Sequence, residues 1–93
     1  MSLIVSKSIE SKLTSKHKVT VDEVKQCFHN REGQLLIDTR ERHKTDPPTQ
    51  WFISSTNKQR QLKIVFVLKD GAVYLKTAYE PNETELNIYR QYG

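Results

Sequence analysis

The sequence predicts an α+β domain with two N-terminal helices, a four-stranded, mainly antiparallel sheet and a C-terminal helix, in the order ααββββα. Three observations favour this class. Apolar residues recur at helical spacing near both ends of the chain, apolar and polar residues alternate through its middle, and Asp70-Gly71 marks a tight hairpin. A chain of 93 residues has room for one hydrophobic core. We therefore expect one domain over residues 1–93, in which residues 1–5 are flexible or an addition to the natural chain.

Two helices are expected before the sheet. Residues 6–17 place apolar side chains one helical turn apart, which is typical of a short amphipathic helix. In the second segment, Thr20 and Glu23 have the spacing of a capping box, in which the side chain of each residue accepts a hydrogen bond from the backbone amide of the other. Apolar residues then follow on one face, and the stretch from Asn30 to Gly33 ends the helix.

The middle of the chain changes to the period of a sheet. The loop at 43–50 is indicated by Pro47 and Pro48, which lack the amide hydrogen that a strand needs. Residues 64–68 are apolar on both faces, which is typical of a central strand covered on two sides. The four expected strands are 34–41, 51–56, 62–69 and 72–80.

The last strand and the terminal helix carry several polar groups. Strict alternation places Tyr74, Lys76 and Ala78 on one face of the strand, and Val73, Leu75, Thr77 and Tyr79 on the other. Asn82 and Glu85 then have capping-box spacing at the start of the helix. On that helix, we expect three side chains to face the core: Leu86, Tyr89 and Tyr92.

Composition limits the classes of function. The formal charge of +4 favours an anionic partner such as nucleic acid or an acidic protein. Cys27 is the only cysteine, so an internal disulfide framework is excluded. No apolar stretch approaches the ~18 residues of a membrane span, and no signal-peptide core is present, so we expect a cytoplasmic protein without membrane contact.

Four stretches carry a resemblance to a known family. "KHKVTVDEVKQCF" (16–28) is similar to the opening of BrnT-type toxins, and "DTRE", "LKIVFVL" and "YLKTAYEPNETELNIYR" follow the same plan over about residues 10–92. The resemblance implies a RelE-like fold, metal-independent RNA cleavage and a complex with an antitoxin. Glu85 and Tyr89 match a glutamate and a tyrosine of the family's terminal helix, whereas Tyr79 stands where the family has an arginine.

Metal-independent RNA cleavage needs a base, an acid and cations that stabilise the pentavalent phosphate. We therefore expect catalytic roles for three residues: His43, Arg60 and Lys76. Phosphate contacts are expected from four more: Arg40, Arg42, Lys44 and Lys58. Alternatives stay open, because His43 can be a solvated loop histidine and the turn around Arg60 can serve only solubility. Cys27 and His29 have no second pair of ligands, so no metal or other cofactor is expected.

Two classes of function are therefore expected. The first is a bacterial toxin-type ribonuclease whose partners are RNA, such as messenger RNA at the ribosome, and a cognate antitoxin. The second is a non-catalytic binding module on the same fold, which holds an acidic partner helix through basic and tyrosine side chains. Both a homodimer and a toxin–antitoxin assembly fit the sequence. A hydrolase of the ADP-ribosyl-dinitrogen reductase type is disfavoured, because those enzymes are larger helical proteins that hold a metal pair.

Overall fold

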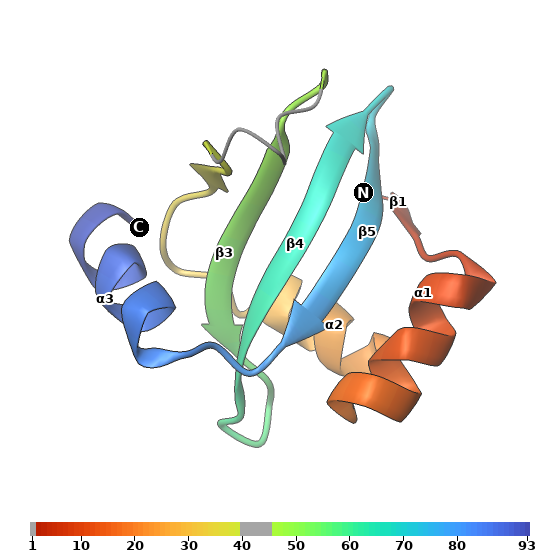
Figure 1. The fold of residues 1–93 in the computed structure, drawn as a ribbon, viewed down its shortest axis with the longest axis horizontal. Helices are drawn as coiled ribbons and strands as arrows, with labels where there is room; N and C mark the ends of the chain where they lie inside the picture. Colours follow the sequence, from red (N-terminus) through yellow and green to blue (C-terminus); the bar gives the residue numbers. More distant parts are fainter. Residues whose placement is uncertain (1, 40–45) are drawn as a thin grey trace.

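A computed structural model describes residues 2–39 and 46–93, which form a five-stranded mixed sheet with helices against it (Figure 1). The strands are β1 (Ser2–Ile4), β2 (Leu36–Ile37), β3 (Thr49–Ser55), β4 (Gln61–Lys69) and β5 (Ala72–Tyr79); the helices are α1 (Lys7–Lys12), its π-helical continuation η1 (Leu13–His17), α2 (Val21–His29) and α3 (Glu83–Tyr92). The strand order across the sheet is β1-β5-β4-β3-β2. The expected α+β class is confirmed.

The expected strand count and element order are wrong in one respect. Residues 2–4, expected to be flexible or added, form β1, which pairs in parallel with β5 from Ser2 opposite Ala72 to Ile4 opposite Tyr74. The sheet is therefore mixed, and a strand precedes the two N-terminal helices. Three residues are too few for a period of two to be recognised, and only the pairing with a strand about seventy positions later along the chain defines this one.

Local signals define the ends of the main elements. Both capping boxes are confirmed: the Glu23 amide donates to Thr20 Oγ1 over 3.1 Å, and the Glu85 amide donates to Asn82 Oδ1 over 2.8 Å. The hairpin between β4 and β5 has Asp70 and Gly71 at positive φ, as a type I′ turn requires.

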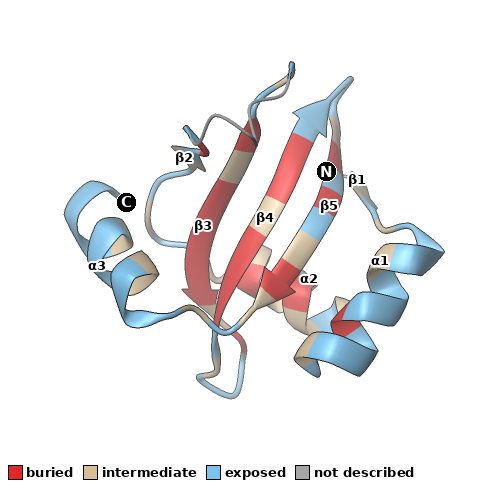
Figure 2. Ribbon diagram, in the orientation of Figure 1, coloured by how far each residue is buried: buried red, intermediate tan, exposed pale blue. Residues whose placement is uncertain are grey.

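The core lies between the sheet and helices α1, η1 and α2. Leu13, Val24, Phe52, Ile64 and Phe66 are almost completely buried there. Cys27 is buried among them as a free thiol, and its burial raises its pKa to about 11. Figure 2 shows the buried stretches concentrated on β3 and β4, at the centre of the sheet.

Because of a β-bulge in β5, the side chains in the second half of this strand lie on the opposite face of the sheet from the one expected. Val65 pairs with Thr77 whereas the next residue, Phe66, pairs with Leu75, so Lys76 is an extra residue in the strand. Val73, Leu75 and Ala78 consequently face the helices together. The expectation that Tyr79 shares a face with Val73 and Leu75 is wrong, because the extra residue shifts the alternation by one position.

Helix α3 lies against β3 at the opposite edge of the sheet from α1 (Figure 1). Tyr89 packs against the core and its hydroxyl donates to the Gln34 carbonyl over 2.7 Å. This contact needs Gly33, because a Cβ at that position would lie 2.5 Å from the Tyr89 hydroxyl oxygen. The expectation that Tyr92 faces the core is wrong: it is 62% exposed, because its side of α3 faces the space between α3 and residues 35–39.

Candidate functional site

A cleft of about 750 Å³ separates α3 from the segment at residues 35–39. Trp51 and Lys63, from neighbouring strands, lie in its lining together with Glu85 of α3. Its walls carry exposed apolar side chains: Leu35, Ile37, Ile88 and Tyr92. A largely apolar cleft with a few polar groups is the usual form of a ligand-binding site, so we call it the α3 cleft and take it as the candidate functional site.

Two polar side chains of the cleft, Lys63 and Glu85, form a cluster with Tyr79, which lies outside the lining. Lys63 Nζ lies 2.7 Å from Glu85 Oε2, and the Tyr79 hydroxyl donates to the same oxygen over 2.7 Å. The second carboxylate oxygen accepts the Asn82 amide at 3.0 Å as part of the capping box. The side chains of Lys63 and Glu85 are only 7% and 15% exposed, so water screens the pair weakly.

Two opposing effects act on the Glu85 carboxyl. Burial raises its pKa, but the hydrogen bonds from Lys63, the Asn82 amide and Tyr79 outweigh burial, so the pKa of Glu85 lies below its ordinary value of 4.5. Glu85 is therefore ionised at neutral pH. The cluster thus contains an ammonium and a phenol that both donate to the same carboxylate oxygen.

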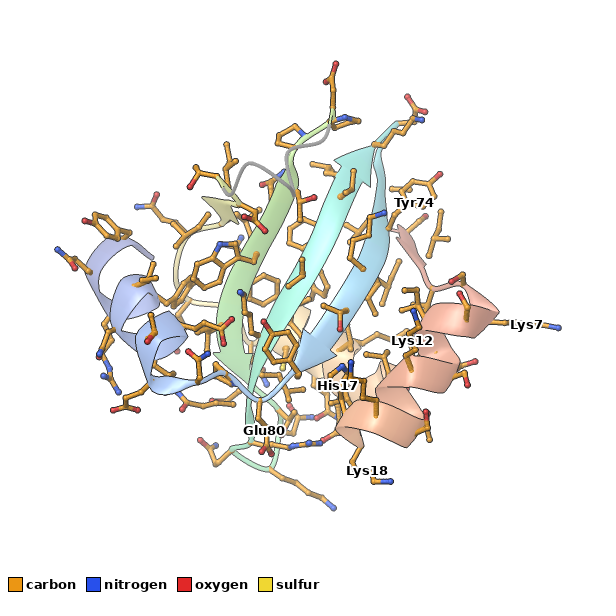
Figure 3. The ribbon with its side chains drawn as sticks, in the orientation of Figure 1. Lys7, Lys12, His17, Lys18, Tyr74 and Glu80 are labelled. Atoms are coloured by element: carbon orange, nitrogen blue, oxygen red, sulfur yellow. The ribbon has the colours of Figure 1, made fainter. Side chains whose placement is uncertain are left out.

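Aromatic rings extend this cluster in two directions. Lys63 Nζ lies 4.5 Å from the centre of the Trp51 ring. The Trp51 ring in turn packs against the Tyr89 ring, with 5.8 Å between the two ring centres. On the other side, the His17 ring lies 5.5 Å from the Tyr79 ring. His17 is at the end of η1, beside the lower half of β5 (Figure 3). An imidazole thus lies next to the phenol.

Arg60, expected to be catalytic, is surrounded by protein acceptors. Its guanidinium donates to Glu80 over 2.7 Å, to both oxygens of Glu23 over 3.1 and 3.2 Å, and to the backbone carbonyls of Lys18 and His17. The hydrogen bond to Glu80 makes the largest contribution in raising the pKa of Arg60 above its ordinary value. Arg60 therefore holds the β3–β4 turn to α2 and to the ends of η1 and β5, and a phosphate would have to displace a carboxylate.

The other expected site residues are spread along the chain. Lys58 is exposed in the β3–β4 turn, and Lys76 is exposed at the bulge of β5. Arg60 bonds Glu80, and Glu80 is four residues beyond Lys76. In an extended chain these four residues span roughly 13 Å between Lys76 and Glu80. The remaining four, Arg40, Arg42, His43 and Lys44, lie outside the described residues. The α3 cleft does not include any of the three that can be placed.

Lys63 is the functional candidate that sequence reasoning missed. It lies in the expected strand 62–69, directly before the stretch 64–68 that is apolar on both faces, and the residue as a whole is 5% exposed. A lysine inside an apolar strand was itself the available signal, because a buried ammonium requires a paired acceptor. The identity of that acceptor depends on the fold, since Glu85 is 22 positions away in the sequence.

Within residues 2–39 and 46–93, no group of three or more histidine, cysteine or acidic side chains is placed to hold a metal ion. In the same part of the chain, no helix has the length and apolar character needed to cross a bilayer. No protein-family model matches the chain, and no curated protein shows a significant match to it.

Proposed function

We propose that this protein is a toxin-type ribonuclease similar to the BrnT toxins, which cleaves RNA without a metal ion and is neutralised by a partner antitoxin. The observation that supports the proposal most directly is the hydrogen bond between Tyr79 and Glu85. These positions correspond, by the resemblance described above, to the end of the family's last strand and to the glutamate of its terminal helix. In this fold they meet beside the α3 cleft, together with Lys63.

In the proposed reaction, the α3 cleft holds the RNA with a base against the exposed Tyr92 ring, because aromatic rings stack with any base. Glu85 accepts the proton of a ribose 2′-hydroxyl, and the 2′-oxygen attacks the adjacent phosphorus. Lys63 and Tyr79 donate to the phosphate oxygens as negative charge develops there. The 5′-oxygen leaves with a proton from His17, which gives a 2′,3′-cyclic phosphate and a free 5′-hydroxyl.

The test is cleavage of single-stranded RNA by the purified protein in the presence of a chelator. We expect Tyr79→Phe to lower the rate on the order of a hundredfold, because the phenol hydroxyl is lost while the ring is kept. Tyr74→Phe is the matched control, since Tyr74 is exposed on the same strand and lies outside the cluster. RNA that stays intact with the wild-type protein would refute the proposal, and equal rates for the two tyrosine variants would refute the role of Tyr79 in it.

A second candidate function is a non-catalytic binding module, and one observation favours it. The Glu85 carboxylate accepts three hydrogen bonds from protein donors, and a carboxylate held in this way is a weak base. The cluster would then only hold α3 against the sheet, while the exposed apolar walls of the α3 cleft bind a partner protein. Induced expression separates the two functions, because a ribonuclease arrests growth and a binding module does not.

A further inference from the structure

A second hollow, of about 1010 Å³, lies on the other side of α3 from the cleft. Four elements surround it: the end of α2 with the loop at residues 29–33, the end of β3, the β3–β4 turn, and the face of α3 that carries Leu86 and Arg90. We call it the arginine pocket, because Arg31 and Arg90 both line it. His29 also lines it.

The two arginines of this pocket differ from Arg60 in their partners. Arg31 donates to the Gly33 carbonyl, and Arg90 donates to Asn87 Oδ1 over 2.9 Å. Neither forms an ion pair with a carboxylate of the described residues, although Glu32 also lines the pocket. A guanidinium has five N–H donors, so both retain donors for a ligand.

The pocket also contains a buried hydroxyl whose hydrogen-bonding capacity is unused. Ser54 is 8% exposed, and its Oγ has no hydrogen-bond partner within the described part of the chain. The oxygen itself is closed off from solvent, so the groups of the lining that can bond a ligand directly are the arginines and the amide side chains. The attraction of cations to helix C-termini accounts for arginines at the ends of α2 and α3, but it does not account for this serine.

The walls of the pocket are held in place by hydrogen bonds between its elements. Asn30 Nδ2 donates to the Ser55 carbonyl over 3.0 Å and to Asn57 Oδ1 over 2.9 Å, and the Asn57 amide donates to Gln26 Oε1 over 2.9 Å. These contacts fix the β3–β4 turn against α2. A site formed in advance loses less conformational entropy on binding.

From these features we infer that the arginine pocket binds phosphate groups of a single-stranded RNA. The arginines bond the phosphates, and amide side chains of the lining such as Asn57 and Gln59 bond the same strand. The identification of the polyanion as RNA rests on the proposed function. The Lys58 predicted from the sequence to bind phosphate lies on the same turn, between Asn57 and Gln59 of the lining.

The test measures binding of a fluorescent single-stranded 2′-O-methyl RNA at several salt concentrations. This probe has no free 2′-hydroxyl, so binding is observed without cleavage. Each phosphate contact to a single strand contributes about 0.7 to the slope of log affinity against log salt. We expect the double variant Arg31→Ala/Arg90→Ala to lose about 1.4 from that slope and about tenfold or more in affinity.

The matched control is Lys7→Ala/Lys12→Ala, which removes the same charge from α1, on the far side of the sheet (Figure 3). An arginine-pocket variant that keeps the wild-type slope overturns the inference, even if the wild-type protein cleaves RNA. Arginine-dependent binding without cleavage of ordinary RNA supports the pocket and refutes the proposed function instead. Pyrophosphate competing as strongly as RNA would assign the pocket to a small anion and overturn the proposal of a strand.

Discussion

Replacing Glu85 by glutamine removes the negative charge beside Lys63 while keeping the shape of the side chain. The capping box survives, because glutamine can also accept the Asn82 amide. The ammonium of Lys63 is left buried without its charged partner. Breaking a fully buried pair costs 3–5 kcal/mol, and the slight exposure of both side chains lowers this to about 2–3 kcal/mol. For a domain of this size, the loss corresponds to roughly 8–24 °C in melting temperature.

The assay is urea unfolding followed by the fluorescence of Trp51, which is the only tryptophan and lies over Lys63 Nζ. The control is Glu83→Gln, an exposed position in the first turn of the same helix. In a double-mutant cycle with Lys63→Met, we expect the two losses to be clearly less than additive. A loss below about 1 kcal/mol for Glu85→Gln, or additive losses, would refute the idea that this pair holds α3 to the sheet.

The same pair predicts a dependence on pH. The pKa of Glu85 is lower in the folded chain than its ordinary value of 4.5. Its contribution to the free energy of unfolding is therefore present above about pH 4.5 and is lost as the pH falls through the folded-state value. Urea unfolding between neutral pH and pH 3 should show a steeper loss for the wild-type protein than for Glu85→Gln. Parallel curves for the two proteins would contradict this assignment.

Three further predictions follow from single contacts. Arg60→Ala should lower the free energy of unfolding by about 1–2 kcal/mol, because two carboxylates and two backbone carbonyls lose their donor. If this variant has unchanged stability but no longer cleaves RNA, Arg60 has a catalytic role instead. Cys27, whose pKa is about 11, should react with a thiol reagent only as fast as the domain opens, and rapid labelling of the native protein would contradict its burial. Gly33→Ala should displace the Tyr89 ring, which a melting temperature equal to that of the wild-type protein would disprove.

Much of the fold depends on local physics that the sequence displays directly. The Asp70-Gly71 turn, the capping boxes of α2 and α3, and the apolar stripe of α2 each need only neighbouring residues to be recognised. Their positions agree with expectation, because the backbone bonding they satisfy is local. The α+β class follows from the order of those elements.

Tertiary structure alone decided the rest, because it depends on contacts between residues far apart in the chain. Strand β1 exists only through its pairing with β5, and the extra residue at Lys76 turns Tyr79 toward Lys63 instead of toward the core. Whether a cation is available to a ligand depends on the carboxylates that the fold brings to it. Arg60 is engaged for this reason, whereas Arg31 and Arg90 keep free donors although the sequence gives no sign of the difference.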